Sequence, residues 1–417
     1  MARRIVRIAR SQNRTAPAAH VEMMQVAPVE TVSLTLTGMA PTGEAIGRFE
    51  GMVVFVPFGL PGEVVDVHIV ERKKKFARGE LVARHSTSPV RTEPVCRYYG
   101  RCGGCDLQHV VYAEQVAIKT AIVREQLARI GRFSGVDGVD GVEGVDGVDG
   151  VDVRPCIASP APYAYRNHAR LAVARNGRLG YRAGRSHDVV VVDDCPILEP
   201  VLNERVQALS RTGVPGHHEE IELRGWTDTV DVNGIAYRVS SGAFFQANTA
   251  VAGWLVDAVM EALAPTGDER VLDLYCGVGL FTVPVGKRVA LIWGVESSAL
   301  AVADAEYNLT AAGIGGKILE AEVGVALTSD PILQMPWDAV VLDPPRTGVD
   351  AGALAAIGQL AAPKLIYVSC EPATLARDAR LLGADGYVLT YVQPFDMFPQ
   401  THHVETLAVF TRQAAAR

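Results

Sequence analysis

The residue of this chain that is best suited to take part in a chemical reaction is Cys370, which lies in the run YVSCEP. The apolar stretch 364–368 before it predicts a buried strand, so the thiol stands where a strand ends. A cysteine in that place is more often a small buried apolar residue than a nucleophile. The run DPPR, which begins at Asp343, follows the apolar stretch 339–342 in the same way. Because such strand ends share the sheet edge where these folds bind ligands, Cys370 is a candidate nucleophile.

A glycine-rich turn provides a second candidate site. The run DLYCGVGLF begins at Asp273, after an apolar strand pattern, and its glycines Gly277 and Gly279 let the backbone approach a ligand closely. Glu296 ends the next apolar run, 23 residues after Asp273, where a carboxylate can accept both hydroxyls of a ribose. A nicotinamide site usually has a third glycine and a cradle for pyrophosphate, and this run has neither. An adenosyl ligand without phosphates, S-adenosylmethionine, therefore fits better.

Four cysteines form a candidate metal site: Cys96, Cys102, Cys105 and Cys195. The first three have the spacing C-x5-C-x2-C, and the glycines Gly103 and Gly104 provide the tight turn that such a loop needs. Thiolates this close bind zinc or an iron–sulfur cluster, and both accept four sulfur ligands, so the spacing does not choose between them. Cys156 has no partner motif, and Cys276 is expected to serve packing.

The elements that must hold these residues alternate between strand and helix in the C-terminal part of the chain. A helical stretch at 249–263 precedes five apolar runs with helix-like segments between them. The runs are 271–275, 291–295, 339–342, 364–368 and 387–392. This alternation predicts an α/β fold with a parallel sheet and helices on both faces.

The N-terminal part has a different pattern. From Thr31 onward, short stretches of period two, broken by glycine and proline, predict a small β-barrel. Its basic loop, 72–78, contains one aromatic residue, which in a small barrel favours an oligonucleotide-binding module over a merely solvated loop. The stretch 112–130 has helical spacing, and Gly131 stands where a C-cap glycine is expected.

Two charged segments follow. The segment 135–153 repeats Gly-Val-Asp and is interpreted as a flexible acidic insertion without chemistry. Without its six acidic residues, the 47 acidic residues of the chain fall to 41 against 40 basic ones, so the net charge of −7 does not argue against a nucleic-acid partner. The stretch 163–187 holds six arginines and no acid around an Asn176-Gly177 turn, which predicts a basic hairpin that contacts phosphates.

Composition excludes several classes of protein. With 417 residues, of which 48% are hydrophobic and 21% charged, the chain can bury a core and is not disordered as a whole. No stretch approaches the roughly 18 consecutive apolar residues of a membrane span, and the arginine-rich start does not have the pattern of a secretory signal. Seven cysteines do not make a disulfide framework in a chain of this length, so a reducing cytoplasm is expected.

Together these motifs resemble the RNA uracil-C5 methyltransferase family, in its iron–sulfur-containing branch. The resemblance rests on FFQAN at 244–248, DLYCGVGLF, LDPPRTG, YVSCEPATLARD and DMFPQTHHVE, and it runs from the barrel to Glu405. It implies a C-terminal Rossmann-like methyltransferase domain of α/β class, an N-terminal OB-like β-barrel called TRAM, and a central β-rich domain. The expected boundaries are 1–25 for a mobile basic arm, 26–86 for TRAM, 87–245 for the central domain and 246–417 for the methyltransferase domain.

The resemblance also implies roles for individual residues. Cys370 would be the nucleophile and Glu405, unremarkable by itself, the general base. The residues that would contact S-adenosylmethionine are Gln246, Tyr275, Glu296, Glu322 and Asp343. The four cysteines would hold a 4Fe–4S cluster with a structural or RNA-folding role. The family often has Asn after the nucleophile, where this chain has Glu371, and the Gly-Val-Asp insertion is foreign to its pattern.

The chemistry of C5 methylation needs these residue types, because C5 of uracil becomes nucleophilic only after a thiolate adds to C6, and a base must then remove the C5 proton. Amino-group methylases instead use a Pro-Pro-aromatic motif, and here Arg346 replaces the aromatic residue. Cytosine-C5 RNA methylases normally have a second cysteine nearby. A non-catalytic RNA-binding or RNA-folding protein of this shape, or a metal-dependent redox protein, is a further alternative.

The expected substrate is a uridine in RNA, with 23S ribosomal RNA favoured over a transfer-RNA uridine-54 target because the cluster-bearing members of the family mostly act on ribosomal RNA. We expect a cytoplasmic monomer without a membrane partner, and no protein partner can be inferred from the sequence.

Overall fold

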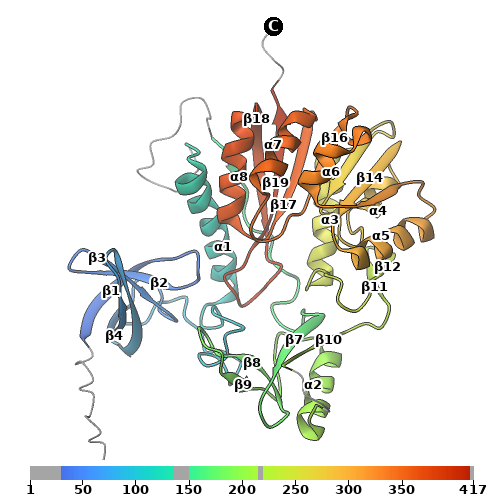
Figure 1. Cartoon of the computed structure of the whole chain (residues 1–417). Coiled ribbons are helices and arrows are strands. Elements are labelled where there is room, and N and C mark those ends of the chain that lie inside the picture. Colours follow the sequence, from blue (N-terminus) through green and yellow to red (C-terminus); the bar gives the residue numbers. More distant parts are fainter. Residues whose placement is uncertain (1–29, 135–149, 215–218, 414–417) are drawn as a thin grey trace, which may run out of the picture.

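The computed structural model describes residues 30–134, 150–214 and 219–413. The expected basic arm at 1–25 and most of the Gly-Val-Asp insertion lie outside these ranges. Figure 1 shows a small barrel beside a larger α/β unit, with a smaller sheet and helix α2 below that unit. Among the described residues, no helix combines the length and the apolarity that crossing a membrane requires.

The barrel is closed by five strands in the order β1-β2-β3-β5-β4. Its strands are β1 (Thr31–Met39), β2 (Ala45–Phe49), β3 (Met52–Val56), β4 (Val64–Arg72) and β5 (Phe76–Arg84). The alternation in β1 has the predicted effect, since Val32, Leu34 and Leu36 are buried while their neighbours face solvent. The predicted barrel is therefore confirmed, and its core consists of small aliphatic side chains.

The smaller sheet has the order β10-β7-β8-β9 and packs on α2. Its elements are β7 (His168–Val173), β8 (Leu179–Arg182), β9 (Val189–Val191), β10 (Glu220–Arg224) and α2 (Pro200–Thr212). Strands β7 and β8 form the predicted hairpin, and Gly177 takes the left-handed conformation of its turn with φ 77°.

The large sheet has eight strands in the order β15-β14-β13-β16-β17-β19-β18-β6. They are β13 (Arg270–Leu274), β14 (Leu291–Glu296), β15 (Lys317–Glu320), β16 (Ala339–Leu342), β17 (Lys364–Ser369), β18 (Tyr387–Phe395), β19 (Glu405–Arg412) and β6 (Asp152–Val153). Strand β19 is antiparallel to both of its neighbours, and the strands from β15 to β17 are parallel to one another. The order reverses between β13 and β16, which is the point where open α/β sheets bind ligands.

Helices cover both faces of this sheet, as predicted. One face packs against α1 (Tyr112–Gln126), the π-helix η1 (Leu127–Gly131), α6 (Val323–Ser329), α7 (Ala351–Leu360) and α8 (Pro372–Ala384). The other face packs against α3 (Thr249–Leu263), α4 (Thr282–Gly286), α5 (Ala299–Ala311) and the hairpin of β11 (Thr229–Val232) and β12 (Ile235–Arg238). The short 3-10 helix η2 (Pro331–Gln334) follows α6.

Two sequence expectations need correction. The helix at 112–130 does not end on a C-cap glycine: its last turn is the π-helix η1, and Arg132 rather than Gly131 takes the left-handed conformation with φ 59°. The end of the Gly-Val-Asp segment is part of the fold, because Val151 and Val153 are buried in the core and β6 pairs with β18. Val151 and Val153 are apolar at alternate positions, as in an edge strand, but the Gly-Val-Asp repeat made this pattern hard to recognise in the sequence.

Candidate active site and cysteine cavity

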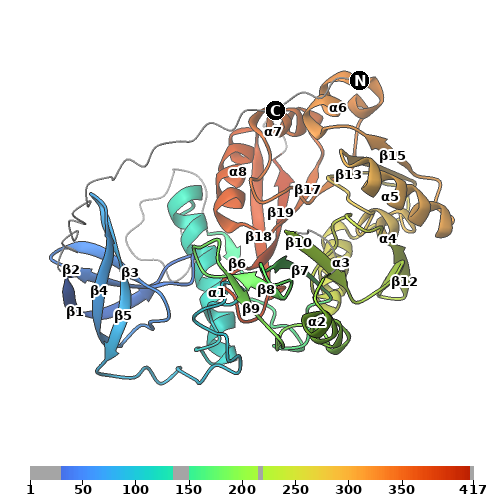
Figure 2. The ribbon, with the colours of Figure 1, turned by 60° about the horizontal axis from the view of Figure 1, so that its bottom comes forward.

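Six of the seven residues expected at the reaction site lie at one edge of the large sheet: three directly follow a parallel strand, Glu322 follows β15 by two residues, and Glu296 and Glu405 are terminal residues of strands. They are Tyr275, Glu296, Glu322, Asp343, Cys370 and Glu405. Because parallel strands all end at the same edge, residues that are far apart in the chain become neighbours there. Figure 2 gives a second view of this edge, with β17, β18 and β19 side by side.

Gln246 reaches the same edge through helix α3. The side chain of Lys364, at the start of β17, donates to the carbonyls of Ala262 and Leu263, so α3 ends at the opposite edge and begins at the edge of the site. Asn248 caps the helix by accepting from Val251 N at 3.3 Å. Gln246, two residues earlier, is buried, and its carbonyl accepts from Asn167 at 2.9 Å.

The thiol and the carboxyl group are brought together by the pairing of β17 with β19. Ser369 lies opposite Thr406, so Cys370 and Glu405 stand next to this pair at the edge of the sheet. Glu405 is only 2% exposed, and its Oε1 has no hydrogen-bond partner among the described residues. A buried carboxyl oxygen without a partner is costly unless a bound molecule provides one, so Glu405 has the surroundings of a functional group.

Charge interactions connect the two groups to the neighbouring strand end. Burial, followed by the charges of Glu405 and Asp343, raises the pKa of the Cys370 thiol to about 12, and Arg346, which hydrogen-bonds to the sulfur, opposes this rise. Burial, and then Asp343, raises the pKa of Glu405 well above its ordinary value. Burial and the nearby Asp273 raise the pKa of Asp343 to about 7. Arg346 places a positive charge beside Cys370 and Glu405, but it does not offset their burial, so a cationic substrate would favour their ionised forms further.

The glycine-rich turn has the backbone that the sequence predicted. Gly277 and Gly279 have φ values of 55° and 89°, and Tyr275 is also left-handed with φ 60°. Glu296 is oriented by the turn, since its carboxylate accepts from Gly277 N at 3.0 Å and from Ser298 N at 2.8 Å. Glu322 is exposed and close enough to raise the pKa of Tyr275.

The loop 396–404 holds Glu405 in place, and sequence reasoning did not identify the residues that anchor it. Lys119 of α1 forms a fully buried ion pair with Asp396 and donates to the Phe398 carbonyl at 2.9 Å. Gln115 of the same helix exchanges two hydrogen bonds of 3.0 Å with Gln400. A lysine and a glutamine on a predicted helix gave no signal of this role, because their partners lie more than 270 residues away in the chain.

The four cysteines of the predicted metal site line one cavity of about 200 Å³ in the smaller sheet region. Burial raises the pKa of the Cys195 thiol to about 11, and Cys102 and Cys96 add to that effect, so the thiols are close to one another. Among the described residues, no group of three or more His, Cys, Asp or Glu side chains is arranged to hold a metal ion.

The cysteine cavity is connected to the loop 396–404. Asp106, next to Cys105, accepts from His402 N at 2.8 Å and pairs with the His402 ring. The Gln400 carbonyl accepts from Leu107 N at 3.0 Å. The segment that carries Cys105 is therefore joined to the loop 396–404 by hydrogen bonds.

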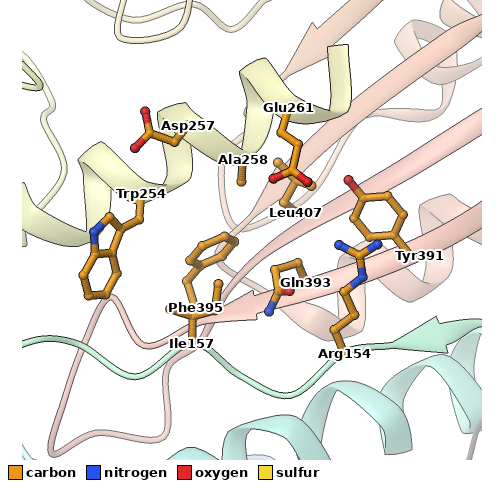
Figure 3. A pocket seen from close by; sticks show the side chains of 10 residues that line it. All are labelled: Arg154, Ile157, Trp254, Asp257, Ala258, Glu261, Tyr391, Gln393, Phe395 and Leu407. Atoms are coloured by element: carbon orange, nitrogen blue, oxygen red, sulfur yellow. The ribbon is translucent and has the colours of Figure 1, made fainter. Parts of the chain in front are cut away.

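A separate cavity of about 170 Å³ lies between α3 and β18. Figure 3 shows Glu261 of the helix facing Tyr391 of the strand, with Arg154 beside that ring, whereas Trp254 lies at the other end of the cavity near Ile157 and Phe395. None of the residues predicted for the reaction lines this cavity.

The fold is that of a Rossmann-like methyltransferase with an added five-stranded barrel. The family models agree: one described as TRAM domain matches residues 25–82, and one described as tRNA (Uracil-5-)-methyltransferase matches 223–320 and 327–413. The chain belongs to the RNA uracil-C5 methyltransferase family.

Its relatives include the 23S rRNA (uracil(1939)-C(5))-methyltransferase RlmD of Pseudomonas aeruginosa, 33% identical, with 90% of this chain and 93% of the relative covered. An uncharacterised RNA methyltransferase of Thermosynechococcus vestitus is 32% identical, with 91% and 98% covered. Among solved structures, the tRNA (uracil-54, C5)-methyltransferase of Pyrococcus abyssi in complex with S-adenosyl-L-homocysteine has a TM-score of 0.68 at 22% identity. It covers 91% of this chain and 100% of its own and supports the fold.

Proposed function

We propose that this protein transfers a methyl group from S-adenosylmethionine to C5 of a uridine in 23S ribosomal RNA through a covalent adduct with Cys370. Family membership and the named activity of the Pseudomonas aeruginosa relative support the reaction and the RNA. The observation that carries the mechanism is the juxtaposition of Cys370 with the buried, unpartnered Oε1 of Glu405.

The proposed reaction has three steps. The Cys370 thiolate adds to C6, so an Sγ–C6 bond forms and the electrons of the C5–C6 double bond move to C5 and the O4 carbonyl. C5 then takes the methyl group, the methyl–sulfonium bond breaks, and S-adenosylhomocysteine is the leaving group. Glu405 finally accepts the C5 proton, the double bond re-forms and the Sγ–C6 bond breaks.

The electrostatics of the site fit this sequence of steps. In the free protein, burial favours the neutral thiol and the neutral Glu405 carboxyl group. The sulfonium of S-adenosylmethionine, placed by Asp343, would favour both ionised forms, because opposite charges nearby stabilise them. Reactive thiolate would then form mainly when the methyl donor is bound.

Two variants test the mechanism. Cys370→Ala is expected to abolish formation of 5-methyluridine, whereas Glu405→Gln is expected to accumulate a protein–RNA adduct that survives denaturing gel electrophoresis. Mapping of 5-methyluridine in total RNA from a deletion strain identifies the target, and loss from transfer RNA instead of ribosomal RNA would reject the proposed substrate. A fully active Cys370→Ala variant would reject the covalent mechanism.

We further propose that the thiols of Cys96, Cys102, Cys105 and Cys195 hold a 4Fe–4S cluster. The four thiols line one cavity, and the resemblance of the chain to the iron–sulfur-containing branch of the family favours a cluster over a zinc ion, which would accept the same four sulfur ligands. When bound, the cluster would cross-link two segments of the chain. We expect a structural role, since the described residues offer no second redox group beside the cavity.

Elemental analysis of anaerobically purified protein tests this proposal. We expect iron and sulfide in equal amounts, loss of both in Cys105→Ser, and retention in the matched control Cys156→Ser, whose thiol is buried outside the cavity. Stoichiometric zinc in place of iron would overturn it.

The division into a TRAM barrel at 26–86, a central domain at 87–245 and a methyltransferase domain at 246–417 is also a proposal. It is supported by separate apolar cores in the barrel and the smaller sheet, although α1, η1 and β6 from the middle segment pack on the large sheet. A monomer acting in the cytoplasm stays a prediction.

A further inference from the structure

A cavity of about 320 Å³ lies between the paired strands β7 and β10 and the loop that leads into α3. Its walls include three arginines and three rings: Arg166, Arg170, Arg224, His168, Trp226 and Phe245. Its volume is near the lower end of the range for ligand pockets, which begins at about 300 Å³. The reaction proposed above uses none of these six side chains.

The charge of this cavity is positive because its single carboxylate is already paired. Glu222 lies opposite Arg170 across the two strands, but its carboxylate accepts from Arg224 Nε at 2.8 Å. The remaining guanidinium nitrogens of Arg224 donate to three backbone carbonyls of the following loop. Arg170 is exposed and forms no ion pair with a described residue, and together with Arg166 it also lines the cysteine cavity.

The aromatic wall of the cavity is centred on Trp226. Its ring lies edge-on to His168, at 6.1 Å between centroids, and to Phe245, at 5.9 Å. The indole Nε1 is buried and has no partner among the described residues, and the guanidinium carbon of Arg224 lies 5.4 Å from the centroid of the Trp226 ring. Burial lowers the pKa of His168 to about 4, so this ring is neutral at physiological pH.

The cavity lies next to the reaction site. Phe245 directly precedes Gln246, and Asn167, which precedes His168, donates to the Gln246 carbonyl at 2.9 Å. Arg166 forms a β-bridge with Asn248 at the cap of α3. Figures 1 and 2 both place β7 and β10 near the start of α3. A strand of RNA with its uridine at Cys370 could therefore reach the cavity within a few nucleotides.

We propose that this cavity binds a second nucleotide of the RNA, a few positions from the target uridine, with its base against Trp226 and its phosphate on Arg170. The proposal rests on the RNA methyltransferase function argued above. Proteins recognise single-stranded RNA by splaying bases out onto aromatic side chains, and guanidinium groups bind the phosphates.

The experiment uses the full-length protein and a 23S rRNA fragment that contains the position named for the relatives, uracil 1939. Trp226→Leu is expected to weaken binding about tenfold, the usual effect of losing one stacked base, and Trp226→Phe less. The KM for S-adenosylmethionine should stay unchanged in both. A thermal unfolding curve like that of the wild type shows that the variants fold.

Abasic substitution identifies the bound nucleotide. Each nucleotide around the uridine is replaced in turn by an abasic residue. At one position the wild type should lose about tenfold in affinity, and there Trp226→Leu should cause no further loss. If the effects multiply at every position, or if Trp226→Leu binds like the wild type, the cavity does not hold a base.

Salt dependence tests the phosphate contact. Arg170→Gln should reduce the slope of log affinity against log salt concentration by about one, as expected for one lost phosphate contact. Arg175→Gln is the matched control, since Arg175 is exposed beside the same hairpin but outside the cavity. Equal slopes for Arg170→Gln and the wild type would reject the phosphate contact.

The same fragment separates the two levels of the proposal. If the wild type forms no 5-methyluridine in it or in full-length 23S rRNA, the proposed function fails. If the wild type methylates the fragment and Trp226→Leu binds it equally well, only the assignment of the cavity fails.

Discussion

Two regions of the molecule position their residues in different ways: the edge of the large sheet that carries Asp343, Cys370 and Glu405, here called the reaction edge, and the cysteine cavity. At the edge, Asp343 and Cys370 directly follow two neighbouring strands, and Glu405 begins the next, so the register of the sheet sets where they stand. In the cavity, the thiols come from a loop at 96–105 and from Cys195, which belong to no regular element. Backbone hydrogen bonds between strands therefore fix the positions of the residues at the edge, whereas turns and loops set the positions of the thiols in the cavity.

This difference teaches where each site is vulnerable. A residue on a buried strand end moves only if the sheet moves, and the large sheet has an extensive apolar core on both faces. Loops have no such support and depend on side-chain contacts. The weak point of the edge is therefore Glu405, because the chain enters its strand β19 from the loop 396–404, which also contacts the cysteine region.

The largest expected effect comes from breaking the anchor of that loop. Lys119→Met leaves Asp396 as an unpaired buried charge, which should lower the free energy of unfolding by about 3–5 kcal/mol. Because Glu405 follows this loop, methyl transfer should also fall. Urea denaturation and the turnover rate measure the two effects.

Two controls accompany this variant. The double variant Lys119→Met with Asp396→Asn should lose less stability, since no charge remains unpaired. Lys73→Met removes only the exposed pair with Glu71, at a cost of less than about 1 kcal/mol. A comparable small loss in Lys119→Met would show that the loop is anchored elsewhere.

The same difference decides how much the sequence could predict. Strand ends are local features, so apolar runs followed by polar residues were enough to locate Asp343 and Cys370 at one edge. The barrel, the hairpin at Asn176-Gly177 and helix α3 were predicted for the same reason, since their periodicity is local. The sequence predicted that these strands form a parallel sheet, but it did not predict which strand pairs with which.

Long-range contacts were beyond such reasoning. Lys119 looked like any helix lysine because Asp396 lies 277 residues away in the chain. Strand β6 was hidden in a repeat, and the cavity around Trp226 combines three segments without a shared motif. Periodicity reports which face a residue occupies but not which distant segment will cover that face.

A smaller effect should come from the charge that faces the thiol. Arg346 lowers the pKa of Cys370, so Arg346→Gln should raise it and slow methyl transfer about tenfold near pH 7, with partial recovery at alkaline pH. Alkylation of Cys370 by iodoacetamide should slow in parallel, which reports thiolate without RNA. An unchanged alkylation rate would contradict this role of Arg346.

The titration of Asp343 separates binding from stability. Its pKa of about 7 means that the carboxylate forms as pH rises from 6 to 8, so affinity for the cationic S-adenosylmethionine should increase about threefold to tenfold. S-adenosylhomocysteine, whose sulfur is neutral, should change less, and Asp343→Asn should reduce the dependence to the part that arises from Asp273, whose pKa is also raised to about 7. Calorimetric titration at several pH values measures it.

The stability of the free protein should move in the opposite direction. Since the folded pKa of Asp343 lies above its ordinary value of 3.8, its contribution is fully present below pH 4 and is lost as pH rises through 7. Asp343→Asn should therefore be more stable than the wild type at pH 8. Equal stability of the two proteins at that pH would mean that the ionised carboxylate carries no cost.

The smallest expected effect concerns the outer edge of the sheet. Val153 of β6 is 6% exposed in the core, so Val153→Ser should lower the free energy of unfolding by about 1–2 kcal/mol without changing turnover. Val70→Ser in the barrel, at a valine 54% exposed, should change stability by less than about 0.5 kcal/mol. If both substitutions cost equally little, β6 rests on the sheet without supporting it. A loss at Val153 alone would mean that the rigid sheet extends beyond the parallel strands of the reaction edge, into the last residues of a segment whose sequence reads as a simple repeat.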